Sequence, residues 1–419
     1  MVRVKPFRTA APALKHPTTV RLIARRLALF PLSSWATPRV KAHRGLNHLF
    51  PASPQSRNSI TKMTSTEREP LLRRIPPALA VPPMLVQPGV EKLGSPATIE
   101  EDTVFPPPTF TASRCDKRKR RMPQCIAHRG YKAKFPENTM AAFAGAVKAG
   151  VHALETDLHI TKDEVVVISH DATLKRCYGR PEKIINCNWA DIKHVRTVAE
   201  PHEPMPRLTD LLEYLAQPGL EEIWLLLDIK LDNDADSIMR LLSSTISSVS
   251  PAANKAWQNR LVLGVWAAKY LPLAQQYLPG FPVMHIGFSV AYARHFLPVP
   301  NVGFNMLFPI LAAPGGRKFI RDAKETYHRQ VLAWTVNDVD KMQWCIRRKI
   351  DGVITDNPTK FLEVCEKFDE SEPEAVFPLR LRAYFDVWRI WATVTLMLFV
   401  WRLFPSMGHP ALIRRKADA

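Results

Sequence analysis

Residues 126–171 read IAHRGYKAKFPENTMAAFAGAVKAGVHALETDLHITKDEVVVISHD. Short apolar runs at 125–128 and 153–158 flank a stretch at 138–149 whose composition favours a helix, and a third apolar run follows at 165–169. A strand, a helix and a second strand in this order form a βαβ unit, in which the two strands are parallel. The stretch therefore predicts an α/β fold.

The same alternation continues as far as residue 368. Further strands are expected at residues 223–229, 261–265, 282–287, 302–306, 331–335 and 352–355. Helices are expected at residues 209–216, 235–247, 268–277, 319–328, 338–347 and 358–368. About eight parallel strands with interleaved helices predict a (β/α)8 barrel, the TIM barrel, over residues 122–370. A doubly wound open sheet is the rival, but it normally carries a glycine-rich phosphate turn after its first strand, and this sequence has none there.

Positive charge is distributed unevenly along the chain. The 419 residues carry a formal charge of +19 with a pI near 9.8, which at first suggests a nucleic-acid ligand. Residues 1–62 hold 12 basic and no acidic residues, whereas residues 122–378 hold 29 basic and 30 acidic residues. A nucleic-acid-binding domain carries its basic residues on folded elements. Because the excess lies in the terminal segments, we expect no nucleic-acid partner.

The N-terminal segment, residues 1–121, contains 17 of the 37 prolines and no sustained periodic stretch, which predicts a disordered, basic extension. Within it, residues 1–62 have the arginine-rich, acid-free composition of a mitochondrial presequence. The alternative is that translation starts at Met63, in which case residues 67–72 (EREPLL) resemble an acidic dileucine sorting signal. The sequence leaves both interpretations open.

Residues 384–404 (YFDVWRIWATVTLMLFVWRLF) are the most apolar part of the chain and follow a linker at 371–383. Their uncharged centre, residues 390–401, has only 12 residues, whereas a membrane span needs roughly 20. We expect a membrane anchor here, as a short transmembrane helix, a hairpin or an in-plane helix, followed by a basic tail at 405–419. The alternative is a helix packed against the barrel.

The pattern of cysteines and of N-glycosylation sequences indicates in which cellular compartment the chain folds. The six cysteines form no C-x-x-C pair, and the chain has no usable N-x-[ST] sequence. Both observations favour a reducing, unglycosylated environment. With the expected anchor, they predict an intracellular, membrane-associated protein at the mitochondrion, the endoplasmic reticulum or the lipid-droplet surface.

Titratable residues stand at the ends of the predicted strands, where the active site of a barrel lies. Glu155 and Asp157 are two apart on one strand, so their side chains point to the same face, and Asp228 stands at the end of another strand. Three carboxylates near the barrel axis would repel one another without a cation. The pattern predicts a site for a divalent cation, Mg²⁺ or Ca²⁺, with these residues as ligands.

Two histidines and two further basic residues complete this set. His128 ends the first predicted strand, His170 follows the third, and the two can serve as general base and general acid. Arg129 comes directly after His128, and Lys230 comes two residues after Asp228. Their charges would neutralise a phosphoryl group beside the cation. This combination indicates phosphodiester cleavage.

Residues 125–368 resemble the glycerophosphodiester phosphodiesterase family. The resemblance is carried by residues 126–171 and by LLLDIK (225–230), LAWTVND (332–338) and GVITDNP (352–358), in the family's order. It implies a TIM barrel with an acid/base pair at His128 and His170, metal ligands at Glu155 and Asp157, and phosphate-binding cations at Arg129 and Lys230. The family often has Glu where this chain has Asp228, so the third ligand departs from the pattern.

The resemblance also implies roles for four neighbouring residues. Glu137 and Asn138 are expected to support and cap the first helix rather than contact substrate. Trp334 and Asn337 are expected to line the mouth of the substrate pocket. Core packing is the alternative for Trp334.

Within that family, the apolar C-terminal segment and residues 225–230, 263–271 and 332–338 look most like the fungal phosphatidylglycerol-specific phospholipase C. This implies a phospholipid substrate, a membrane as partner, and cleavage of phosphatidylglycerol to diacylglycerol and glycerol 3-phosphate. One alternative is an enzyme for deacylated, water-soluble glycerophosphodiesters. Another is an inactive barrel that binds or tethers lipid. The C-terminal segment favours the lipid substrate, because a soluble substrate gives no reason to hold the barrel on a bilayer.

Overall fold

The computed structural model describes residues 97–99, 103–252, 255–374, 379–403 and 413–415. The presequence, the start at Met63 and the dileucine signal all concern residues outside these ranges. The same holds for most of the basic tail at 405–419.

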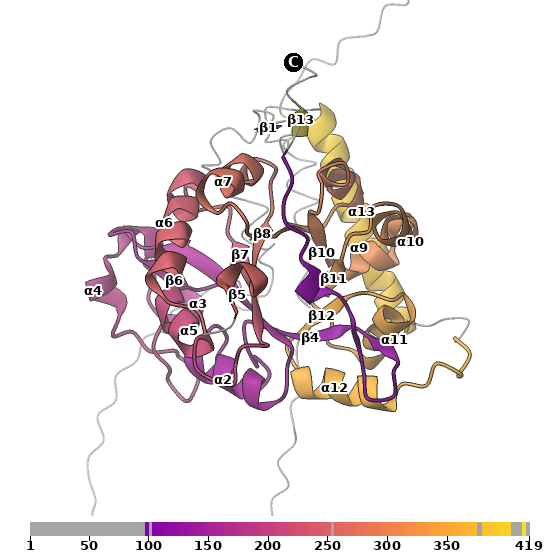
Figure 1. The fold of residues 1–419 in the computed structure, drawn as a ribbon, viewed down its shortest axis with the longest axis horizontal. Coiled ribbons are helices and arrows are strands. Elements are labelled where there is room, and N and C mark those ends of the chain that lie inside the picture. The colour runs from indigo at the N-terminus through magenta and orange to yellow at the C-terminus, as the bar shows by residue number, and fades with distance from the viewer. Residues whose placement is uncertain (1–96, 100–102, 253–254, 375–378, 404–412, 416–419) are drawn as a thin grey trace, which may run out of the picture. The chain divides into compact units, whose positions relative to one another are not determined.

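Eight parallel strands form a closed barrel, as the sequence predicted (Figure 1). The strands are β4 (Gln124–His128), β5 (Ala153–Ile160), β7 (Trp224–Ile229), β8 (Leu261–Val265), β9 (Val283–Gly287), β10 (Gly303–Leu307), β11 (Val331–Trp334) and β12 (Gly352–Thr355). Each strand pairs in parallel with its neighbours, and pairing of β4 with both β12 and β5 closes the ring. The carboxyl ends of all eight strands therefore meet at one mouth.

The third predicted strand is not a barrel strand. β6 (Val166–Ile168) pairs antiparallel with β5, with Leu158 opposite Ile168. A parallel pair needs a crossover of about a dozen residues or more, and only residues 161–165 separate these two strands. The chain therefore turns straight back, and the other eight predicted strands form the barrel.

Helices surround the barrel in the order that βα units require. They are α2 (Met140–Lys148), α5 (Leu208–Leu215), α6 (Ala235–Ser248), α7 (Tyr270–Tyr277), α9 (Phe308–Ala312), α10 (Gly316–Arg321), α11 (Val339–Arg347) and α12 (Pro358–Lys367). Shorter turns of helix are α3 (Lys175–Tyr178), α4 (Trp189–Ile192), α8 (Val290–Ala293) and the single turns η3 (Ile184–Asn186), η4 (Trp257–Asn259), η5 (Arg294–Phe296) and η6 (Asp322–Thr326).

Alternation along the strands divides the core into two parts. On β7, Leu225 and Leu227 pack with the helices in the larger cluster of buried residues. Trp224 and Leu226 belong instead to a second cluster that fills the barrel interior, with one residue from most other strands. Side chains of successive residues point to opposite faces of a strand, so every second residue reaches the barrel axis. That rule also carries the polar strand-end residues inward.

The expectation of disorder up to residue 121 is wrong for residues 103–121. This segment contains η2 (Thr109–Thr111) and a hairpin of β2 (Arg114–Cys115) with β3 (Arg121–Met122), and Phe105 is 2% exposed. Gln124 Nε2 donates to the backbone oxygens of Phe110 and Ala112 at 2.7 and 2.5 Å. The indigo segment runs across one mouth of the barrel in Figure 1. Because Gln124 begins β4, this is the amino end.

A buried aspartate joins several segments at the amino end of the barrel. Asp351 directly precedes β12 and is 3% exposed. Its Oδ1 accepts a hydrogen bond from Arg121 Nη2 at 2.7 Å, and its Oδ2 accepts from the backbone N–H of Val331 at 2.9 Å and from Lys324 Nζ. Asp351 therefore joins the hairpin at residues 114–122 to two barrel strands.

The C-terminal segment forms α13 (Leu381–Leu403), which packs against α9. Ala383, Val387 and Ile390 are buried, whereas Phe385 and Trp388 on the other face are 69% and 58% exposed. Among the helices that the structure describes, none has the length and apolar content needed to cross a membrane. The expected transmembrane anchor is thus unsupported. The first half of the segment instead matches the alternative of a helix packed against the barrel.

A short strand precedes the hairpin segment in the sequence. β1 (Ala97–Ile99) pairs in parallel with β13 (Ile413–Arg415), outside the barrel. The two segments belong to the N-terminal and C-terminal ends of the described chain.

Candidate active site

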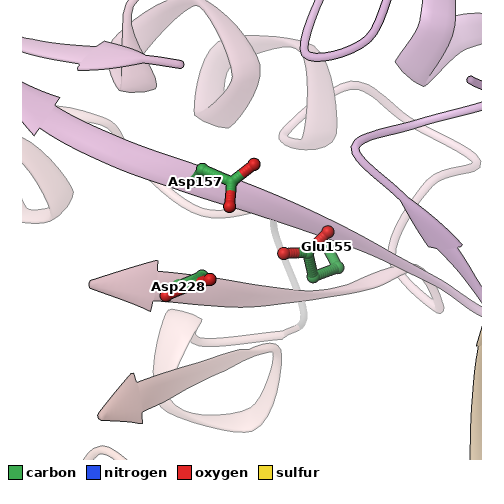
Figure 2. A group of neighbouring side chains, drawn as sticks. All are labelled: Glu155, Asp157 and Asp228. Carbon is green, nitrogen blue, oxygen red and sulfur yellow. The ribbon is translucent and has the colours of Figure 1, made fainter. Parts of the chain in front are cut away.

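The three predicted carboxylates lie together at the carboxyl mouth. Asp157 on β5 stands directly opposite Asp228 on β7 in the parallel ladder, and Glu155 lies two residues earlier on β5. Figure 2 shows their side chains on these two neighbouring strands. One oxygen from each residue lies within 4.8 Å of the other two, and all three residues are buried. The strand register thus gathers three carboxylates in a space that one ion can fill.

Lys230 and Arg129 face this acidic cluster. Lys230 Nζ lies 2.6 Å from Asp157 Oδ1 and 2.6 Å from Asp228 Oδ2, and Arg129 Nε lies 3.2 Å from Asp157 Oδ2. Burial alone would raise the pKa of Asp157, but the two cations hold it well below its usual value. The pKa of Glu155 moves the other way, because burial and the charges of Asp157 and Asp228 raise it well above the ordinary range.

The charge balance of the cluster fits a divalent cation. The carboxylates of Glu155, Asp157 and Asp228 carry three negative charges when ionised, and Lys230 and Arg129 carry two positive charges, which leaves one negative charge. A bound phosphodiester adds a second. The donors are carboxylate oxygens within 4.8 Å of one another, which is the chemistry that hard divalent cations prefer. These residues can therefore hold such an ion.

His128 at the end of β4 is held by an aspartate that the sequence reasoning did not assign. His128 Nδ1 lies 2.6 Å from Asp356 Oδ1, and Asp356 follows directly after β12. Burial and the charge of Arg129 lower the pKa of His128, and the hydrogen bond to Asp356 opposes this shift. The signal was present in GVITDNP (352–358), where an aspartate stands at the end of the last barrel strand.

Asn337 holds this aspartate in turn. Its Nδ2 donates to Asp356 Oδ2 at 2.8 Å, and its Oδ1 accepts from the backbone N–H of Asp356 at 2.9 Å. Asn337 therefore orients Asp356, the partner of His128. The sequence had led us to expect Asn337 to line the mouth of the substrate pocket.

His170 has an aspartate partner of a different kind. Its Nδ1 lies 2.8 Å from Asp171 Oδ1, and Asp171 Oδ2 accepts from Arg176 Nε at 2.7 Å. Burial, with the charges of Arg129 and Lys230, lowers the pKa of His170 to about 4. The charge of Arg129 thus lowers the pKa of both histidines.

Glu137 links the two histidine regions. Arg129 Nη1 donates to Glu137 Oε1 at 2.8 Å, and Arg176 donates to both Glu137 oxygens at 2.7 and 2.9 Å. Arg176 also binds Asp171, the partner of His170. Glu137 therefore fixes the direction of the Arg129 side chain.

The expectation that Asn138 caps the first helix is wrong. Thr139 is the cap of α2, because its Oγ1 accepts from the backbone N–H of Ala142 at 3.2 Å. Asn138 Nδ2 instead donates to Asp157 Oδ2 at 2.7 Å, and its Oδ1 accepts from Thr156 Oγ1 at 3.0 Å. Its φ of 56° turns the side chain from the helix toward the acidic cluster.

The turn after β4 depends on a glycine. Gly130 has a φ of 77°, and a Cβ there would lie 2.7 Å from the backbone of Ala142. A side chain at this position would push α2 away from the strand. The turn also lets the Arg129 backbone N–H donate to Glu155 Oε2 at 2.9 Å, so it fixes one oxygen of the acidic cluster.

Aromatic residues occupy the other half of the mouth. Trp266 follows β8, Phe288 follows β9 and Trp334 ends β11. The Trp266 ring lies 5.6 Å from the ring of Trp334 and 6.3 Å from that of Phe288, measured between centroids. The acidic cluster, its two cations and the pair of His128 with Asp356 come from the contiguous strands β12, β4, β5 and β7 or directly follow them. The site therefore has a charged half and an aromatic half.

Comparison with known proteins gives a consistent result. Residues 128–360 match the model of the Glycerophosphoryl diester phosphodiesterase family. Lysophospholipase D GDPD1 of Rattus norvegicus is 27% identical over 295 residues, covering 59% of this chain and 87% of that protein. Glycerophosphodiester phosphodiesterase of Bacillus altitudinis is 22% identical over 249 residues, covering 59% of this chain and 99% of that protein.

A solved structure has the same fold. An Oleispira antarctica phosphodiesterase in complex with the product sn-glycerol-3-phosphate superposes with a TM-score of 0.50 and 21% identity. The superposition covers 59% of this chain and 98% of that one.

Proposed function

This chain belongs to the glycerophosphoryl diester phosphodiesterase family, whose members are phosphodiester hydrolases, and from this premise we propose that it cleaves phosphatidylglycerol. The products are diacylglycerol and glycerol 3-phosphate, so the activity is that of a phospholipase C. The observation that carries the choice of a lipid is the exposed apolar face of α13. The choice of reaction rests on the residues at the carboxyl mouth.

The charged half of the mouth is the place for the phosphodiester. Arg129 and Lys230 supply positive charge to its non-bridging oxygens. A divalent cation, Mg²⁺ or Ca²⁺, bound by Glu155, Asp157 and Asp228 would neutralise the charge that develops on those oxygens during the reaction. The rigid placement of these groups on barrel strands keeps the phosphorus atom near both histidines.

The reaction uses the free 2-hydroxyl of the glycerol head group. One histidine takes the proton of this hydroxyl while its oxygen attacks phosphorus, and the bond from phosphorus to the diacylglycerol oxygen breaks. The second histidine protonates the departing oxygen. One water then opens the cyclic glycerol phosphate to glycerol 3-phosphate, and the two histidines exchange roles in this second step.

The aspartate partners suggest which histidine acts first as the base. Asp356 and Asp171 both face the Nδ1 atom of their histidine, which leaves Nε2 for the substrate. Arg176 shares the charge of Asp171 and so weakens its support for a protonated His170. Asp356 supports the positive charge that His128 gains when it takes the proton, so we propose His128 as the base and His170 as the acid.

The C-terminal helix supports a lipid substrate. Leu381, Phe385, Trp388, Leu396 and Phe399 recur at the spacing of one helix face, and each is between 39% and 87% exposed. The helix begins at the carboxyl end of the barrel, because the backbone N–H of Arg380 donates to Asp340 in the first turn of α11. The apolar face thus starts near the same mouth as the site.

We propose that this face lies in the plane of a membrane surface and brings the mouth to its substrate. An amphipathic helix binds a bilayer through the apolar area that it buries. Arg380 and Arg382 at its start are exposed and favour an anionic surface such as phosphatidylglycerol provides. The membrane would be that of the mitochondrion, the endoplasmic reticulum or the lipid droplet.

The second candidate is hydrolysis of water-soluble glycerophosphodiesters. The names of the Bacillus altitudinis relative and of the product in the Oleispira antarctica complex favour it. The name of the rat relative adds lysophospholipids to the substrates to be tested. All of these substrates have the phosphodiester that the charged half can bind. They differ in their remaining groups, which the aromatic half and α13 would recognise.

A substrate panel with surface variants tests the proposal. Full-length protein is assayed on phosphatidylglycerol vesicles, lysophosphatidylglycerol and glycerophosphoglycerol, as wild type, as Phe385→Asp/Trp388→Asp and as the control Val198→Asp, whose side chain is 61% exposed. We expect the double variant to lose about tenfold or more on vesicles and little on glycerophosphoglycerol, because only the bilayer contacts the helix face.

The outcomes separate the candidates. Turnover of glycerophosphoglycerol alone would rule out the phospholipase proposal and leave the soluble-substrate enzyme. A protein that binds vesicles but turns over no substrate in the panel would instead be the inactive tethering barrel.

A further inference from the structure

Trp266 makes a direct hydrogen bond to the acidic cluster. It follows β8, is 7% exposed, and its indole Nε1 donates to Asp228 Oδ1 at 2.6 Å. The other oxygen of this carboxylate, Oδ2, lies 2.6 Å from Lys230 Nζ. Each oxygen of Asp228 therefore has its own partner, which fixes the rotation of the carboxylate group.

The indole ring is itself held on several sides. It packs edge-on against Trp334, with an angle of 81° between the ring planes, and at a tilt of 45° against Phe288. Lys230 Nζ lies 5.9 Å from the Trp266 ring centroid, within cation–π distance. Rings in such an arrangement keep their orientation, so the indole N–H is a fixed donor.

We propose that Trp266 is a positioning residue for the divalent cation and acts through Asp228, an inference that rests on the proposed cation site. By holding Oδ1 of Asp228, the indole directs Oδ2 of the same carboxylate toward Asp157. Lys230 Nζ lies between the two residues and contacts both Asp228 Oδ2 and Asp157 Oδ1. Hydrogen-bond partners of metal ligands typically contribute 10- to 100-fold to metal affinity. Trp266 would be such a partner, supplied by the aromatic half of the mouth.

Calorimetric titration of the full chain with MnCl₂ tests this role. Trp266→Phe keeps an aromatic ring but removes the N–H, and we expect it to weaken Mn²⁺ binding about 10- to 100-fold. Trp257→Phe is the matched control, because Trp257 is 4% exposed and donates its indole N–H to the Val249 backbone oxygen at 2.7 Å, away from the site. Its Mn²⁺ affinity should stay within about twofold of wild type.

A double-variant cycle separates positioning from general packing. If Trp266 acts through Asp228, Trp266→Phe should lower Mn²⁺ affinity in the wild-type background but not in Asp228→Asn. An equal loss in both backgrounds would overturn the proposal. So would Mn²⁺ binding by Trp266→Phe at wild-type strength, while the cation site itself would stand.

A measurement on unsubstituted protein covers the case in which Trp266→Phe does not fold. With ¹⁵N-labelled tryptophan, one indole N–H signal should shift when MgCl₂ is added, and the same signal should be displaced in Asp228→Asn. Absence of any indole shift despite Mn²⁺ binding in calorimetry contradicts the role of Trp266. Absence of Mn²⁺ binding to wild type contradicts both this role and the proposed cation.

Discussion

Two aspartates flank the same strand and serve opposite ends of the barrel. Asp351 precedes β12 at the amino end, where its carboxylate binds Arg121, Lys324 and the Val331 backbone. Asp356 follows β12 at the carboxyl end, where its carboxylate binds His128 and Asn337. Asp351 thus faces two permanent cations, whereas Asp356 faces a histidine that can gain or lose a proton, with Lys132 Nζ farther away at 3.7 Å.

The difference reflects how charge is used at the two mouths. At the amino end, the Asp351 carboxylate is outnumbered by its cations, and its contacts join the hairpin at residues 114–122 to the barrel. At the carboxyl end, three carboxylates outnumber two cations, and burial keeps the resulting repulsion strong. A carboxylate that its cations outnumber stabilises the fold, whereas the excess of carboxylates at the carboxyl end is available to a cationic ligand.

The largest effect is expected from Asp356→Asn. Without the carboxylate, His128 loses the partner that fixes its tautomer, and kcat should fall between about 100- and 1,000-fold. Asp356 raises the pKa of His128. Its removal lowers that pKa, and because a general base must be unprotonated, the acid limb of the kcat/KM profile should move to lower pH.

The thermal unfolding midpoint of Asp356→Asn should stay near that of wild type. Asp171→Asn is the companion variant, with a smaller loss expected because Arg176 already shares the charge of Asp171. A larger loss for Asp171→Asn would reverse the assignment of base and acid.

Asp351→Asn should show the converse behaviour. Removing this buried carboxylate leaves Arg121 and Lys324 without their counter-charge, which should lower the free energy of unfolding by about 3 kcal/mol. Measured in urea at 25 °C, the loss should appear as a lower midpoint, while kcat/KM of the folded enzyme stays unchanged.

The exposed Asp191→Asn serves as the control and should unfold like wild type. A catalytic defect in Asp351→Asn with normal stability would show that the two ends of the barrel are not independent.

The smallest effect concerns stability at the carboxyl end. Burial, Asp157 and Asp228 raise the pKa of Glu155 in the folded chain above its unfolded value. The folded state then holds the proton more tightly, so its stability falls as pH rises above the unfolded pKa. Without added metal at pH 7, the free energy of unfolding of Glu155→Gln should exceed that of wild type by about 1 kcal/mol. This difference in stability should vanish toward pH 4.

Added Mn²⁺ should reverse this order, because the ion stabilises wild type more than the glutamine variant. Glu213→Gln, at an exposed position, is the control. Equal stability of Glu155→Gln and wild type across this pH range would show that the acidic cluster stores no repulsion.

Much of the barrel could be predicted because its signals are periodic. Apolar runs such as residues 223–229 and 261–265 mark buried strands, and the polar residues at their ends mark the mouth. The strand at β6 was predicted but its antiparallel direction was not, because direction depends on the length of the connection, which the apolar pattern does not encode. Residues 103–113 were missed because single anchors such as Phe105 hold them, without any repeating pattern.

The partners of the site residues were harder to predict than the residues themselves. Asp356 reaches His128 from a position 228 residues later in the chain, and Trp266 reaches Asp228 across 38 residues. Such pairs depend on which strands are neighbours and on side-chain direction, and neither can be inferred from the local sequence. Asn138 shows the same limit, since its residue type suits a helix cap but its left-handed backbone directs it to Asp157.

The strand register has a consequence for how such a chain can change over generations. His128 stands opposite Glu155, and Asp157 opposite Asp228, so three strands must keep their alignment for the site to exist. Inserting one residue into β5 before Glu155 would turn both of its carboxylates out of the barrel at once. Substitutions can therefore accumulate one at a time, whereas changes in length are confined to the connections, where new substrate contacts can arise without moving the acidic cluster.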